Sequence, residues 1–274
     1  PPDVETAMTR VLDYMNAPRG TLTLGDLRPL LRFMRSAAAT ERPWLPADRW
    51  KASGAGAVTV LPGPYTKFLD LYYSTNVPDY AIFSSALRYS ANLDPEHFTR
   101  VTRTCVLRDI PLNSFAYGKF LCIEETTPNQ QSGTAYHYTN ERIFVHANVA
   151  GTPIFISFAN MVGRSSFGLR GLPVGPPEDH LYYYSKLRGT NMRGLNWVTP
   201  VMYASTTLVM HMPLSSNTTA ALGFSWVNAG WKGLNVTRSH HIYPIILTAQ
   251  ERKVMLARDP RVTYTSMATL AHRA

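Results

Sequence analysis

Hydrophobic and polar positions alternate in two stretches in the middle of the chain. Ile143 and Val145 occupy alternate positions in residues 142–148, and Ile154, Ile156 and Phe158 do so in residues 153–161. A period of two places successive side chains on opposite faces of a strand. Both stretches are therefore predicted to be strands with one apolar face.

Further strands are predicted from runs rich in β-branched and aromatic residues. These runs are residues 65–73, 99–108, 115–124, 197–212, 219–228, 234–238 and 242–247, while residues 84–90 fit a strand or a short helix. The Gly-, Pro- and Arg-rich residues 163–194 are predicted to form a long surface loop. About eight strands with long irregular connections favour an all-β fold, an eight-stranded antiparallel jelly-roll β-sandwich with short helices.

A helix is predicted near the N-terminus, where Asp26 is a candidate N-cap and Pro29 falls in the first turn. Its apolar face consists of Leu27, Leu30, Leu31 and Met34, and its basic face of Arg28, Arg32 and Arg35. The pattern fits a structural helix packed against a neighbour, or a helix that contacts RNA. Residues 5–15 predict a weaker amphipathic helix.

The chain is predicted to form one domain with two extensions. Residues 1–55 form an N-terminal arm with the short basic helix, residues 56–250 the jelly-roll domain, and residues 251–274 a polar, basic C-terminal tail. Trp44 and Trp50 lie in a Pro- and Gly-rich segment and are expected to anchor it.

Composition favours a subunit that assembles with others. Charged residues make up 16% of the chain, below the roughly 25% of ordinary soluble domains, while hydrophobic residues reach 45%. The net charge of +9 attracts polyanions, but the basic residues are dispersed along the chain. The sequence shows no signal peptide and no apolar run long enough to cross a bilayer, so a soluble, intracellular protein is expected.

The sequence offers little for catalysis or cofactor binding. Residues 163–168 match neither a nucleophile elbow nor a phosphate-binding loop, and the histidines lack metal-site spacing. Cys105 and Cys122 are expected to be free thiols in strands rather than a disulfide. The protein is predicted not to be an enzyme and to use neither a cofactor nor a metal ion.

Two groups of residues are candidates for contact with partners. The RNA- or interface-facing candidates are Arg28, Arg32, Arg35, Lys186 and Arg188, and the interface aromatics are Trp44, Trp50, Tyr183, Trp226 and Trp231. Aromatic rings stack on single-stranded RNA, but aromatic and Arg side chains are also enriched at protein interfaces, which is the favoured interpretation.

Three segments resemble capsid proteins of picorna-like viruses. Residues 24–33, LGDLRPLLRF, resemble the S-L/I-R-Q-L-I/L-K-R-F/Y tract before the first strand in that family, and residues 197–205, WVTPVMYAS, resemble its V-P-Y-x-S region. Residues 220–226, AALGFSW, are similar to its R-A-x-G-D-D-F-S-F strand but lack the two acidic residues of that strand. The resemblance is strongest to the five-fold-axis subunit of dicistrovirus- and iflavirus-like shells.

This resemblance implies a structural protein of an icosahedral RNA virus. Such a subunit assembles with copies of itself and with other capsid proteins, encloses genomic single-stranded RNA, and binds a host receptor. Its expected locations are the virion and, during assembly, the host cell cytoplasm. The alternative is a cellular β-sandwich binding module, either lectin-like or RNA-binding, which accounts for the strands and the charge but not for residues 24–33.

Overall fold

The structure is a computed structural model. It describes residues 6–7, 9–10, 23–38, 51–73, 75, 77–83, 86–107, 109–127, 134–166, 168–170, 172–174, 181–183, 192–193, 200–259 and 261. Statements about the fold refer to these residues.

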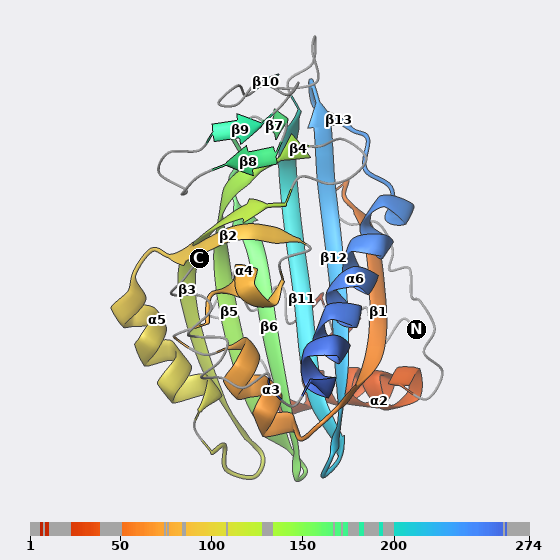
Figure 1. Ribbon diagram of the computed structural model, residues 1–274. Coiled ribbons are helices and arrows are strands. Elements are labelled where there is room, and N and C mark those ends of the chain that lie inside the picture. The colour runs from red at the N-terminus through yellow and green to blue at the C-terminus, as the bar shows by residue number, and fades with distance from the viewer. Residues whose placement is uncertain are drawn as a thin grey trace.

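One curled antiparallel sheet forms the centre of the molecule, with strand order β1-β12-β11-β6-β5-β3-β2 and β13 paired with β12 (Figure 1). The strands are β1 (Ser53–Pro62), β2 (Leu87–Asn92), β3 (Ser114–Thr126), β5 (His137–Val149), β6 (Thr152–Val162), β11 (Val201–Ser215), β12 (Thr218–Trp231) and β13 (Leu234–Asn235). Ala150 and Gly151 both have positive φ and close the β5–β6 hairpin with a tight turn.

Short strands and helices complete the fold. The short strands at one end of the sheet are β4 (Thr134–Ala135), β7 (Leu169–Arg170), β8 (Leu172–Val174), β9 (Leu181–Tyr183) and β10 (Met192–Arg193). The helices are α2 (Leu24–Ala38), α3 (Tyr65–Tyr72), α4 (Asp79–Ile82), α5 (Pro95–Val101) with the π-helical turn Thr102–Val106, and α6 (Ser239–Arg258).

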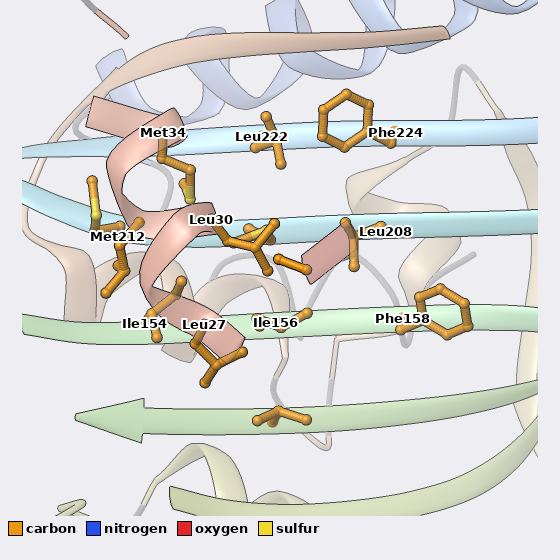
Figure 2. Packing of buried hydrophobic residues seen from close by; sticks show 14 of the residues in the cluster. Leu27, Leu30, Met34, Ile154, Ile156, Phe158, Leu208, Met212, Leu222 and Phe224 are labelled. Carbon is orange, nitrogen blue, oxygen red and sulfur yellow. The ribbon is translucent and has the colours of Figure 1, made fainter. Parts of the chain in front are cut away.

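One face of the sheet is covered by α2. Figure 2 shows Leu27, Leu30 and Met34 of this helix directed at the aliphatic side chains of the sheet. The sheet contributes Ile154, Ile156, Phe158, Leu208, Met212, Leu222 and Phe224. The predicted helix and its apolar face are therefore confirmed, although Asp26 lies in the first turn, where its carboxylate accepts hydrogen bonds from the backbone N–H and the hydroxyl of Thr23.

The other face of the sheet is covered by α3, α4, α5 and α6. Helix α6 lies along β1 and β12 (Figure 1), and its Ile242 and Ile246 pack on Ala55 and Ala57 of β1. Small side chains at these positions let the helix approach the sheet closely. Aromatic residues of α3 and α5 pack against β3, β5 and β6 further along the same face.

The predicted eight-stranded jelly-roll sandwich is wrong. A jelly roll places two sheets face to face, whereas the main strands here belong to one sheet and helices cover both of its faces. The strands predicted at residues 115–124, 142–148, 153–161, 197–212 and 219–228 correspond to β3, β5, β6, β11 and β12. Residues 84–90 include the start of β2.

Three predicted strands are helices. Residues 65–73 form α3, residues 99–108 include the end of α5 and the π-helical turn, and residues 242–247 lie within α6. The last helix runs across residue 251, the predicted start of the C-terminal tail, and β1 begins before residue 56. Within the described residues, the helices are too short or too polar to span a membrane.

Candidate functional site

The face of the sheet beneath α3–α6 holds a group of buried or nearly buried polar side chains. Side chains alternate between the two faces of a strand, so Cys122 and Glu124 of β3 lie together on this face. Arg142 and His146 of the neighbouring strand β5 lie on the same face. The α2 face is lined mainly by aliphatic side chains at the corresponding positions, such as Ile143 and Val145. Burying polar groups is costly unless they are paired, so this asymmetry marks the α3–α6 face as the candidate site.

A cavity of about 190 Å³ opens on this face, between the end of α3, the start of α4, and strands β2, β3 and β5. Four aromatic rings line it, those of Tyr72, Tyr73, Phe98 and Phe144. Asp79 and Arg142 contribute charge, and Thr75, Ser90 and Asn92 contribute hydroxyl and amide groups. The cavity therefore combines apolar walls with a few polar groups, which is typical of small-molecule sites.

Arg142 is the centre of a charged network beside the cavity. Its guanidinium pairs with Asp79 through Nη1 and donates through Nη2 to Glu124 Oε1 at 2.8 Å. The hydroxyl of Tyr138 and the amide of Asn140 donate to Glu124 Oε2 at 3.1 and 2.7 Å. Burial opposes the charge on Arg142, but Asp79 and Glu124 outweigh it and raise the pKa of the guanidinium, which stays charged.

Glu124 is the most deeply buried carboxyl group of the network. Burial raises its pKa, and the opposing effects of Arg142 and the Tyr138 hydrogen bond do not cancel this increase. Arg142 Nε and Asn140 Oδ1 are buried and have no hydrogen-bond partner among the described residues. Such unpaired polar atoms are uncommon in folded proteins, and a functional role is one of the explanations for them.

A second polar cluster lies between α6 and the sheet. Lys253 of α6 is 2% exposed, and its Nζ lies over the rings of Tyr72 and Phe83, 5.7 and 5.3 Å from their centroids. The hydroxyl of Tyr72 donates to the Lys253 carbonyl oxygen at 3.3 Å. Burial lowers the pKa of the Lys253 amine to about 7.

The buried histidines occupy one row across the sheet. His146 pairs with Phe155, which pairs with His211 on the next strand. Burial lowers the pKa of both imidazoles, most strongly for His211, so both are neutral at neutral pH. His146 Nδ1 forms a hydrogen bond with the Cys105 carbonyl oxygen at 2.9 Å. The hydroxyl oxygen of Tyr73 lies 3.3 Å from His211 Nδ1.

Cys105 and Cys122 are free thiols, as expected, but only Cys122 lies in a strand, because Cys105 belongs to the π-helical turn. Burial raises the pKa of each thiol, and Glu124 beside Cys122 adds to this effect despite the opposing charge of Arg142. Because the thiolate is the reactive form, neither cysteine is suited to be a nucleophile.

The sequence-predicted contact residues lie away from the cavity or outside the described residues. Arg28, Arg32 and Arg35 are exposed on α2, and Arg35 donates to the Thr152 hydroxyl at 2.9 Å. Trp226 is 1% exposed and packs on Phe224 in the α2-side core, and Trp231 is half-buried at the end of β12. Trp44, Trp50, Lys186, Arg188 and the side chain of Tyr183 lie outside the described part of the structure.

The residues of the polar clusters were not predicted from the sequence. One signal was present in α6, whose sheet-facing stripe of Ile242, Ile246, Gln250, Lys253 and Ala257 places an amide and an amine on an apolar face. Interpreting residues 242–247 as a strand and the following residues as a tail concealed this pattern.

Two solved structures show a distant similarity. The human StarD13 (DLC2) lipid transfer and protein localization domain has a TM-score of 0.38 and 9% sequence identity, covering 84% of this chain and 96% of that chain. Human STARD10 has a TM-score of 0.35 and 8% identity, covering 93% of this chain and 83% of that chain. No protein-family model and no curated protein match the sequence. Scores this low assign neither a family nor a ligand to this chain.

The resemblance to picorna-like capsid proteins is wrong. The main strands form a single curled sheet with the C-terminal helix packed on it, whereas the resemblance implies a jelly roll with two facing sheets. The roles that followed from it are wrong as well: shell subunit, structural virion protein, and location in the virion and host cell cytoplasm. Capsid and RNA partners have no support, nor does the lectin-like or RNA-binding β-sandwich.

The short matches to the capsid proteins have a physical explanation. Residues 24–33 form most of α2, whose repeated leucines are needed to pack the helix on the sheet. Residues 220–226 lie in the centre of β12, where Leu222, Phe224 and Trp226 fill the α2-side core. Amphipathic helices and strands of unrelated folds produce similar patterns.

Proposed function

We propose that this protein binds a small amphipathic molecule in the cavity between α3–α4 and the sheet, and that it does not transform this ligand as an enzyme. The observation that carries the proposal is the composition of the cavity wall, in which four aromatic rings face a charged Arg142–Asp79 pair. Apolar walls supply affinity and a few fixed polar groups supply orientation. The buried, protonated thiols favour binding over covalent catalysis by cysteine.

The volume of the cavity limits the size of the ligand. At about 190 Å³ it exceeds the ~150 Å³ cavity that accepts benzene and is smaller than the ~300 Å³ at which sites for drug-sized ligands begin. An aromatic ring or a short acyl group with one polar end fits this space. A diacyl phospholipid is too large for it.

Thermal unfolding in the presence of 4-methylphenol tests the proposal. A ligand that binds only the folded state stabilises it, so the midpoint of unfolding should rise with 4-methylphenol concentration. Dioctanoylphosphatidylcholine should produce no rise. Stabilisation by the phospholipid but not by the phenol would contradict the proposed ligand class.

Two variants locate the binding site. Asn92→Trp places a large side chain at the cavity wall and should abolish the stabilisation by 4-methylphenol, because Asn92 lines the cavity and pairs with Cys122 on the same face of the sheet. Ala204→Trp is the matched control, since Ala204 is a half-buried strand residue outside the cavity lining. Equal ligand responses of the two variants would show that binding occurs elsewhere.

A further inference from the structure

Lys253 is an amine buried without a carboxylate partner among the described residues. Its side chain is 2% exposed, and the groups beneath its Nζ are the rings of Tyr72 and Phe83. Rings attract a cation only modestly compared with the cost of removing an ammonium ion from water. The site therefore favours the neutral amine, and burial lowers the pKa of Lys253 to about 7.

A neutral lysine amine has a free electron pair and is a nucleophile. Desolvation in an apolar pocket is one of the ways in which lysines are activated to form imines with carbonyl compounds. Lys51 and Lys232 are exposed to solvent and lack this apolar environment.

The neighbours of Lys253 connect it with the cavity and with a free ring nitrogen. The Lys253 amine lies over the ring of Tyr72. Tyr72 and Tyr73 both line the cavity. The Tyr72 ring lies 5.8 Å from that of His211, whose Nε2 is buried and has no hydrogen-bond partner among the described residues. A protonated Lys253 would further lower the pKa of His211, which shows that the two groups are close.

We propose that Lys253 captures a small aldehyde or ketone reversibly as an imine. The inference rests on the proposed function, because the carbonyl compound is expected to enter through the cavity, whose wall shares Tyr72 with the surroundings of Lys253.

The chemistry needs no oxidant or reductant. The amine electron pair attacks the carbonyl carbon, a C–N bond forms, and the carbonyl electrons move to oxygen. Transfer of a proton from nitrogen to oxygen gives a carbinolamine. Loss of the hydroxyl group with a proton releases water and leaves the C=N bond.

Reductive trapping on the full chain tests this inference. The protein is incubated at pH 7 with 4-hydroxybenzaldehyde and sodium cyanoborohydride, which reduces imines to stable secondary amines, and the modified lysines are quantified by peptide mass spectrometry. About half of the Lys253 amines are neutral at this pH, against fewer than about one in a thousand for an exposed lysine. Lys253 should therefore be modified at least tenfold faster than Lys51 and Lys232.

Competition separates this inference from the proposed function. An excess of 4-methylphenol, which has no carbonyl group, should slow modification of Lys253 severalfold and leave Lys232 unchanged. If the phenol stabilises the protein but Lys253 is modified no faster than Lys51, ligand binding in the cavity is supported and the proposed imine at Lys253 is wrong. If Lys253 is modified selectively while the phenol neither binds nor competes, the amine is confirmed as reactive and the proposed cavity function fails.

Discussion

The buried ionisable residues of this protein avoid unpaired charge in two different ways. Arg142 stays charged because Asp79 and Glu124 surround it. Lys253 and His211 lack such partners among the described residues, and burial favours their neutral forms. Buried charge is tolerated when it is paired and is otherwise removed by a pKa shift.

Lys253→Met should stabilise the protein most strongly at neutral and acidic pH. The unfolded lysine has a pKa near 10.4, whereas burial lowers the folded value to about 7. Below pH 7 both the folded and the unfolded protein hold the proton. The full cost of burying the charged amine, about 5 kcal/mol from this pKa difference, is then present. Between pH 7 and 10 only the unfolded state binds the proton, so wild-type stability rises by about 1.4 kcal/mol per pH unit.

Urea unfolding of the wild type and of Lys253→Met at pH 7 and pH 9 measures this effect. The advantage of the variant should shrink by roughly 2–3 kcal/mol between the two pH values, because the wild type alone loses its penalty. Comparing the two proteins cancels the contributions of other titrating groups. An advantage that stays constant with pH would show that Lys253 is charged in the folded state.

At the scale of single elements, α6 belongs to the core although its sequence resembles a strand followed by a tail. Leu256 is 6% exposed in the cluster with Phe68 and Tyr72, whereas the adjacent Met255 is 63% exposed. Leu256→Ala should destabilise the protein by about 2–5 kcal/mol, the usual cost of truncating a buried leucine. Met255→Ala, the matched control, should change stability by less than about 0.5 kcal/mol. Similar unfolding midpoints for both variants would show that the end of α6 is detached from the sheet.

Strands with strict alternation were predictable from the sequence, whereas short aromatic-rich helices were not. Ile143, Val145, Ile154 and Ile156 alternate because one face of β5 and β6 packs under α2. Residues 65–72 contain aromatic and aliphatic residues that favour strands, but Phe68, Leu69 and Tyr72 share one helical face. Over eight residues, composition does not separate a buried strand from a helix.

The candidate site was beyond sequence reasoning for a different reason. Glu124, Arg142 and His211 lie on three strands, and Lys253 lies on a helix. None of these residues belongs to a motif with fixed spacing, and only the pairing of the strands brings them together. The number of predicted strands likewise suggested a two-sheet sandwich. The number alone does not show whether a sheet packs against a second sheet or against helices.

At the scale of the whole molecule, the sheet separates two unlike layers. Phe224 of β12 fills the layer beneath α2, while the adjacent Gly223 faces Gln250 of α6. Helix α2 and the cavity therefore lie on opposite sides of a sheet whose strands are continuous through both regions. A ligand bound in the cavity would contact the segment between α3 and α4, the edge strand β2 and the adjacent strand β3.

Amide hydrogen exchange with and without 4-methylphenol tests this two-layer arrangement. Ligand binding stabilises the local structure that forms the site, so exchange should slow in residues 77–83 and 87–92. Exchange in α2 should remain unchanged, because its contacts are with the opposite face. Asn92→Trp, with its cavity filled, should show no ligand-dependent slowing in either region. Protection of α2 instead of residues 77–83 would place the ligand on the aliphatic face and require a different site.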